Sequence, residues 1–233
     1  MYFLHCPENT FDHIFVTSDI HGNIHKFEQM LSTIEYNPEN DLLIILGDLV
    51  DRGNNNLDCL KKAMELSEGG AIVLKGNHDE MLELCLKDIV NDTREFDVDF
   101  WCRCNGGLKT LTELQSITPE EAKEYCSFLH DLPLGLTIDN LVFVHAGIDS
   151  SKPLQKQHKD DLLWIREEFI ESKAIEGSLV IFGHTPTLYM QDTTDISRST
   201  IWHSKDKIGI DCGAAYGGRL ACLEIRSMTE YYL

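Results

Sequence analysis

Five short apolar runs, each followed at once by polar residues, are the feature that most restricts how this chain can fold. Each run is four to six residues long and rich in β-branched and aromatic side chains, which is typical of buried strands. The runs span residues 13–18, 42–46, 71–75, 141–144 and 179–182, and the polar residues that follow them span 19–23, 47–53, 76–79, 145–147 and 183–186.

Helix-like spacing of apolar residues separates the early runs. Asn23 can cap a helix over residues 24–33, Leu57 and Leu60 belong to a second helix, and residues 81–90 form a third. Strand–helix–strand alternation predicts parallel strands in an α/β fold. Because ligands bind outside the carboxyl ends of parallel strands, we expect the polar residues to meet at one site.

The pattern changes after the third run. Residues 91–99 are polar and predict a loop, while Thr118-Pro119 marks a helix that includes residues 122–129. We interpret residues 91–140 as a mostly helical insertion in a single domain of residues 1–233. Farther on, residues 160–172 predict one helix, and residues 191–204 an exposed loop or an irregular strand. Residues 207–211 and 219–225 predict two more strands.

Composition limits the partners. Lys plus Arg number 20 against 39 Asp plus Glu, and this net charge of −19 argues against nucleic acid and an anionic membrane surface as partners. No apolar run approaches the roughly 20 residues of a membrane span. Without a basic leader at the N-terminus, we expect a cytoplasmic protein. The pair Cys102 and Cys104 has no second pair to complete a zinc site, so a structural or incidental role is favoured.

The side chains that follow the strands are ones that bind cations and phosphate. They are Asp19, His21, Asp48, Asp51, Arg52, Asn77, His78, Asp79, His145 and His184. Taken alone, Asp51 and Arg52 could equally form an ion pair in a polar turn. Oxygen and imidazole donors without thiolate favour Mn²⁺, Fe or Zn²⁺. Their number exceeds one tetrahedral site and fits two ions that share a carboxylate, about 3.5–4 Å apart in two-metal hydrolases.

These blocks resemble the signature of the PPP family of metallophosphatases, within the calcineurin-like phosphoesterases. The matching blocks are Asp19-x-His21-Gly22, Gly47-Asp48-x-x-Asp51-Arg52-Gly53, Gly76-Asn77-His78-Asp79, His145-Ala146-Gly147 and Gly183-His184-Thr185. The short chain and residues 162–167 most resemble the bacterial and phage branch, typified by the bacteriophage lambda protein phosphatase. The resemblance implies a calcineurin-like metallophosphoesterase fold, in which two mixed β-sheets pack as a sandwich flanked by helices.

The resemblance also implies a site with two divalent metal ions, Mn²⁺ ahead of Fe or Zn²⁺. The first ion would be held by Asp19 and His21, both ions by Asp48, and the second by Asn77, His145 and His184. The implied general acid is His78, which Asp51 would orient and keep charged. Arg52, Arg166 and Asn77 would bind the phosphate oxygens. For Arg166 the alternative is a helix arginine paired with a neighbouring glutamate.

The implied activity is that of a phosphoprotein phosphatase. It would hydrolyse phosphoserine and phosphothreonine esters, and also phosphotyrosine or small phosphoesters, by in-line attack of a metal-bridging hydroxide. One alternative within the same family is a bis(5'-nucleosyl)-tetraphosphatase, and Asp51-Arg52 with His184-Thr185 favours the phosphatase over it. The other is an inactive binding module, which the presence of every ligand and of His78 disfavours. The sequence does not indicate an oligomeric state.

Overall fold

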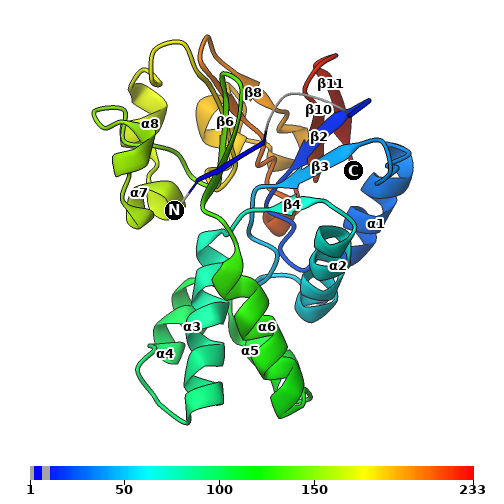
Figure 1. The fold of residues 1–233 in the computed structure, drawn as a ribbon, viewed down its shortest axis with the longest axis vertical. Coiled ribbons are helices and arrows are strands. Elements are labelled where there is room, and N and C mark those ends of the chain that lie inside the picture. The colour runs from blue at the N-terminus through cyan, green and yellow to red at the C-terminus, as the bar shows by residue number, and fades with distance from the viewer. Residues whose placement is uncertain (1–2, 7–10) are drawn as a thin grey trace.

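Two mixed β-sheets packed face to face form the centre of the computed structural model, which describes residues 3–6 and 11–233 (Figure 1). The five-stranded sheet has the order β11-β10-β2-β3-β4. Its strands are β2 (Ile14–Thr17), β3 (Leu42–Ile45), β4 (Ile72–Val73), β10 (Ala221–Glu224) and β11 (Thr229–Tyr232). Strands β2, β3 and β4 run parallel, whereas β10 pairs antiparallel with both β2 and β11.

The six-stranded sheet has the order β1-β5-β6-β7-β9-β8. Its strands are β1 (Phe3–His5), β5 (Gly135–Ile138), β6 (Leu141–Val144), β7 (Leu179–Phe182), β8 (Trp202–His203) and β9 (Lys207–Gly209). Strands β6, β7 and β9 are parallel, so their carboxyl ends lie at one edge of the sheet.

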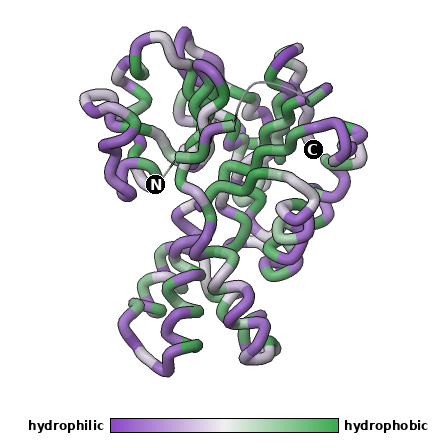
Figure 2. Tube along the Cα trace, in the orientation of Figure 1, coloured by the Kyte–Doolittle hydropathy of each residue, from purple (hydrophilic) through white to green (hydrophobic). Residues whose placement is uncertain are grey.

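Each inner strand is apolar on both faces, because each sheet is covered on both sides. Val16 and Ile44 pack between the sheets, while their neighbours Phe15 and Leu43 pack against helices. The helices on that face are α1 (Ile24–Thr33) and α2 (Asn56–Glu68), and α7 (Lys159–Trp164) and α8 (Glu167–Glu171) cover the six-stranded sheet. Figure 2 shows the hydrophobic strands at the centre and more hydrophilic residues on the outer helices.

Four further helices form a lobe at the lower end of Figure 1. They are α3 (Asn77–Asn91), α4 (Val98–Cys104), α5 (Leu108–Leu114) and α6 (Pro119–Asp131). The start of α6 is fixed by Thr118, whose hydroxyl accepts a bond from the Glu121 N–H (3.1 Å) while the Glu121 carboxylate accepts one from the Thr118 N–H (2.8 Å).

The predicted fold class is confirmed: two mixed sheets form a sandwich flanked by helices. The five apolar runs are β2, β3, β4, β6 and β7, and α1 has the predicted bounds. Within the described residues, no helix has both the length and the apolar character needed to cross a membrane.

Three local predictions were wrong. The Asn23 side chain does not cap α1, because its amide donates backward to the Ile20 carbonyl (2.7 Å). Residues 160–172 form two short helices, since the backbone leaves the helical region at Ile165 and Arg166. The predicted loop at 91–99 already includes the start of α4. Within residues 91–140, β5 follows the helices α4, α5 and α6. The division into one domain stays a prediction.

A buried charged cluster joins α3 to the short segment between β4 and that helix. Lys75 donates to Glu83 (2.6 Å), and both side chains are almost inaccessible to solvent. Lys87 and His130 also contact the Glu83 carboxylate. Burial by itself raises the pKa of Glu83, but the hydrogen bonds from Lys75, Lys87 and His130 lower it to about 2, from an ordinary value of 4.5. The charged form of Glu83 is therefore favoured by folding.

We expect Glu83→Gln to lower the free energy of unfolding by about 3 kcal/mol at pH 7, because it leaves the Lys75 charge buried without its carboxylate. Since the folded pKa lies below the unfolded one, Glu83 contributes its full stability above pH 4.5 and loses it as the pH falls towards about 2. Urea unfolding of both proteins between pH 7 and pH 3 should show the difference shrinking below pH 4.5. A constant difference would contradict this account.

Candidate metal centre

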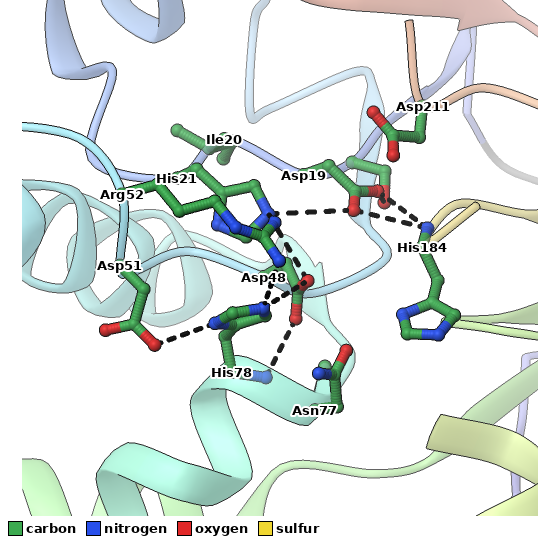
Figure 3. Close-up of polar contacts among 12 residues, drawn as sticks. Asp19, Ile20, His21, Asp48, Asp51, Arg52, Asn77, His78, His184 and Asp211 are labelled. Carbon is green, nitrogen blue, oxygen red and sulfur yellow. Dashed lines mark hydrogen bonds and ion pairs between the residues drawn. The ribbon is translucent and has the colours of Figure 1, made fainter. Parts of the chain in front are cut away.

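The strands bring the predicted site residues together at one edge of the sandwich (Figure 3). Asp19 and His21 follow β2, and Asp48, Asp51 and Arg52 follow β3. The others begin α3 or follow β6 and β7: they are Asn77, His78, His145 and His184. Asn77, His78 and Asp79 therefore belong to the first helical turn of α3, whereas the sequence pattern placed that helix only from residue 81.

The backbone at this edge is held in an unusual conformation. Of the ten non-glycine residues with positive φ in the described part of the chain, six belong to the predicted site: Asp19, His21, Asp48, Asp51, Arg52 and His184. Such conformations cost of order 1–3 kcal/mol each and concentrate at functional sites. The concentration at these six residues therefore marks the edge as a functional site.

Two glycines let the backbone approach the carboxylates closely. A Cβ on Gly76 would lie 2.2 Å from Oδ1 of Asp48, and a Cβ on Gly183 would lie 2.2 Å from Oδ2 of Asp19. Only glycine avoids these clashes without moving the carboxylates.

Three of the histidines direct one ring nitrogen into the site. The second ring nitrogen of each forms a hydrogen bond to the backbone, which fixes the orientation of the ring. Nδ1 of His21 donates to the Val50 carbonyl (2.7 Å), and Nδ1 of His145 donates to the Leu46 carbonyl (2.9 Å). His184 also has a backbone hydrogen bond, to Trp164. Metal-binding histidines characteristically fix their second nitrogen in this way. Nε2 of each ring is then a lone-pair acceptor that faces the centre.

Burial keeps these rings neutral. It is the main cause that lowers the pKa of His21 and His184 well below the usual range, with neighbouring His78 and His145 respectively as the next cause. Burial likewise lowers the pKa of His145 to about 4. All three rings can therefore act as ligands at neutral pH.

Asp48 lies at the centre of the acceptor atoms. Its Oδ1 lies 3.3 Å from Nε2 of His145, and its Oδ2 lies 3.4 Å from Nε2 of His21. Burial, followed by the charges of Asp19 and Asp79, raises the pKa of Asp48 well above its usual range. A cation between these groups would remove this penalty.

The residues fit two divalent ions that share Asp48. Two groups of potential ligands, His21–Asp48–His78 and Asp48–His145–His184, each have ligand atoms within 4.8 Å of one another. Nε2 of His184 is buried and has no hydrogen-bond partner among the described residues. Nε2 of His145 lies 3.0 Å from Oδ1 of Asn77, where two lone pairs face each other. Converging acceptors with few donors are the arrangement that a bound cation satisfies.

His78 differs from the other histidines, although it lies in one of these groups. Its Nδ1 donates to a carboxylate, Oδ2 of Asp51 (2.7 Å), and its Nε2 accepts from Nη2 of Arg52 (2.7 Å). Burial and the charge of Arg52 lower the pKa of His78. Arg52 therefore contacts His78 and His21, while Asp51 contacts His78. Asp51 and Arg52 thus have different partners, instead of forming the ion pair that the sequence left open.

The two arginines come from different segments of the chain, Arg52 from the loop after β3 and Arg166 from between α7 and α8. The Arg52 guanidinium lies over the Tyr216 ring, 5.1 Å from its centroid. Nη1 of Arg166 donates to the carbonyl of His184 (3.1 Å) and to the hydroxyl of Thr185 (3.3 Å). Because Arg166 lies between α7 and α8, it is not the mid-helix arginine of the alternative interpretation.

Sequence reasoning named Asp79 without assigning it a role, and it missed Trp101, Thr110 and Asp211, which also support the site. Asp79 accepts backbone N–H bonds from Gly76, Asp48 and Leu49 at 2.8–3.0 Å, and thereby joins α3 to the loop after β3. Trp101 and Thr110 donate to Asp51. Asp211 is buried next to Asp19, and its position just after β9 was the signal that could have revealed it.

A buried cluster of neutral imidazoles and carboxylates at the strand ends of a β-sandwich defines a metal-dependent hydrolase site. The model of one family, described as calcineurin-like phosphoesterase, matches residues 13–210. The chain belongs to this family, and it is a metallophosphoesterase whose site has ligands for two metal ions.

Curated relatives of this chain have two different activities. It is 30% identical over 223 residues to a protein named serine/threonine-protein phosphatase 1 from Salmonella typhimurium, with 92% of each chain covered. It is 39% identical over 191 residues to the symmetrical bis(5'-nucleosyl)-tetraphosphatase of Glaesserella parasuis, covering 79% of this chain and 62% of the relative.

Solved structures share the fold at low identity. One of them, a proposed diadenosine tetraphosphatase, has a TM-score of 0.73 and 22% identity, and covers 100% of this chain and 97% of its own. A cold-active protein tyrosine phosphatase has a TM-score of 0.63 and 16% identity, and covers 100% of this chain and 80% of its own.

Asp48→Asn should remove more metal than Asp19→Asn, because Asp48 is the carboxylate between the two ligand groups. Residues that only support metal ligands change metal affinity by about 10–100-fold, so we expect at least about 100-fold weaker binding of both ions in Asp48→Asn. Asp19→Asn should keep one ion. Mn²⁺ titration by calorimetry gives the stoichiometry of each variant, and circular dichroism controls for folding. Equal losses would contradict a central role for Asp48.

Proposed function

We propose that this chain is a metal-dependent phosphoprotein phosphatase that hydrolyses phosphoserine and phosphothreonine esters, and also accepts phosphotyrosine. The observation that carries the proposal is the placement of His78. One of its nitrogens is fixed by a buried carboxylate, and the other faces a guanidinium and the lone pairs of the candidate metal ligands. That arrangement suits protonation of an alkoxide that leaves phosphorus.

The proposed ligands are Asp19 and His21 for one ion, Asn77, His145 and His184 for the other, and Asp48 for both. When bound, two divalent ions, Mn²⁺ ahead of Fe or Zn²⁺, neutralise phosphate charge and make a water nucleophilic at neutral pH. The protein contributes rigid ligands, since Asp19, His21, Asp48 and His145 are almost completely buried.

Phosphate binding is assigned to Arg52, Arg166 and Asn77. The donors of Arg52 point at acceptors in the site, and a phosphate would offer oxygens of opposite charge in their place. Arg166 is held at the rim by the backbone of His184. Guanidinium groups match phosphate geometry and stabilise the charge of the transition state.

The proton moves along a short path. Asp51 fixes the Nδ1–H of His78, so the proton for the leaving oxygen would be given from Nε2, the nitrogen that contacts Arg52 when no substrate is bound. A protonated Nε2 would be held by the negative field of Asp51 and of the substrate phosphate. After the alkoxide is protonated, the ring takes a proton from solvent.

Coverage of the relatives favours a protein phosphatase. The chain spans 92% of the serine/threonine-protein phosphatase relative but 62% of the symmetrical tetraphosphatase. The 39% identity to the tetraphosphatase is the higher of the two, so hydrolysis of dinucleoside polyphosphates is the second candidate function. Neither the coverage nor the identity of these relatives supports a catalytically inactive binding module.

A direct comparison of substrates separates these functions. With Mn²⁺ present, we expect phosphate release from a phosphoserine peptide to have a kcat/KM more than about 10-fold above that for ADP release from diadenosine tetraphosphate, because a site shaped for one leaving group discriminates against another. Chromatography of the nucleotides and a colorimetric phosphate assay give the two rates. A preference for the dinucleotide would instead establish the second function.

Replacing the proposed acid tests the mechanism. His78→Asn should lower kcat on a phosphoserine peptide by about 10²–10⁴-fold, the usual contribution of general acid catalysis. Hydrolysis of p-nitrophenyl phosphate should change far less, since that leaving group needs little protonation. Bound metal should be unchanged in the variant. Equal losses on both substrates would show that His78 does not act as the acid.

A further inference from the structure

The helices α4 and α5 contact the proposed acid machinery through two side chains. Nε1 of Trp101 donates to Oδ2 of Asp51 at 2.6 Å, and Oγ1 of Thr110 donates to Oδ1 of Asp51 at 2.6 Å. Trp101, Thr110 and Asp51 are all completely buried. Both oxygens of the carboxylate are thus held from the helical lobe, while Oδ2 also accepts from His78.

The same helices hold the rest of the loop that carries Asp51. The carbonyl of Gly106 accepts from the N–H of Arg52 (3.1 Å), and Nζ of Lys109 donates to the carbonyl of Arg52 (3.0 Å). One turn farther along α5, the Glu113 carboxylate accepts from the N–H groups of Asn56 and Leu57 at 3.0 and 2.8 Å. The lobe is therefore connected to this loop from residue 51 to residue 57.

We propose that Trp101 and Thr110 are positioning residues, which fix the Asp51 carboxylate so that the His78 ring is aimed at the leaving group. The inference rests on the proposed function, because it assigns these residues to the proton transfer of that same reaction. The helical lobe would then take part in catalysis, although it lies outside the five sequence blocks that follow the strands.

The hydrogen bonds that the Asp51 carboxylate accepts support this role. A carboxylate without solvent needs donors on both oxygens, since an unsatisfied buried acceptor costs about 1–3 kcal/mol. Burial raises the pKa of Asp51 to about 6, and the bonds from Thr110 and Trp101 act against that rise. Three donors around one carboxylate also fix its plane, and the plane sets the direction of the bond to His78.

A purely structural role is the competing explanation. Trp101 lies against Phe96, with ring centroids 5.8 Å apart, and a Cβ on Gly107 would lie 2.3 Å from the Trp101 ring. Its loss could therefore loosen the lobe without any specific effect on the acid. The test must use small changes and a readout that depends on protonation of the leaving group.

Thr110→Val is the sharpest variant, because it keeps the shape of the side chain and removes only the donor. Thr110→Ser keeps the hydroxyl and should restore activity. Thr112→Val is the matched control: it makes the same change on the same helix, at an exposed threonine whose hydroxyl bonds to the Leu108 carbonyl. Trp101→Phe removes the second donor independently, should Thr110→Val fail to fold.

Each variant is assayed with a phosphoserine peptide and with p-nitrophenyl phosphate, at the same Mn²⁺ concentration. We expect Thr110→Val and Trp101→Phe to lower kcat on the peptide by about tenfold, a part of the 10²–10⁴-fold effect of a general acid. The aryl phosphate rate, KM and bound metal should change less than about twofold, and Thr112→Val should match the wild type. In a His78→Asn background, Thr110→Val should have no further effect on kcat.

Two results would overturn the inference. One is an equal loss on both substrates, which indicates a structural role. The other is wild-type activity of Thr110→Val and Trp101→Phe on the peptide, which shows that His78 does not depend on them. If the wild-type protein with Mn²⁺ hydrolyses neither phosphoester, the proposed function fails instead, so the two failures are distinguishable.

Discussion

The convergence of lone pairs inside the protein is the constraint on which the rest of the site depends. Imidazole nitrogens of His21 and His145 lie 3.3–3.4 Å from the Asp48 carboxylate, and Nε2 of His184 has no donor within the described residues. Such an arrangement is unfavourable unless cations complete it. Its free-energy cost has to be met by the stability of the two sheets, whose inner strands are covered on both faces.

The sheets deliver this geometry because parallel strands of both end at the same edge. Residues directly after β2, β3 and β7 take left-handed conformations, which turn the chain sharply so that ligands follow the strand at once. Gly76 lies so close to Asp48 that no other residue has room for its Cβ at this position. Strain of this kind persists only where the surrounding structure leaves no alternative, and here the strands on either side provide that restraint.

Local patterns in the sequence were enough to predict the apolar strands, the helix α1 and the set of residues that gather at the site. The spacing of apolar residues and the position of a residue at a strand end can both be read from neighbouring residues. Contacts between distant residues left no such pattern. Trp101 and Thr110 lie 50 and 59 residues from Asp51, and nothing in their own neighbourhood indicates a buried carboxylate partner. Likewise the break at Arg166 interrupts a run whose composition favours one helix, so a contact with His184, and not propensity, determines the backbone there.

The hydrogen-bond donors around each carboxylate explain how Asp48, Asp51 and Asp79 can have separate roles. Asp79 accepts from three backbone N–H groups, and Asp51 accepts from Trp101, Thr110 and His78, so the oxygens of both are occupied. Asp48 accepts only one such bond among those of the described residues, from the N–H of His78 (3.0 Å). An ionised carboxylate can accept about four bonds, so Asp48 keeps about three lone pairs for cations, whereas Asp79 and Asp51 each keep about one. The division between ligand, orienting group and structural cap therefore follows from which donors the fold brings to each carboxylate.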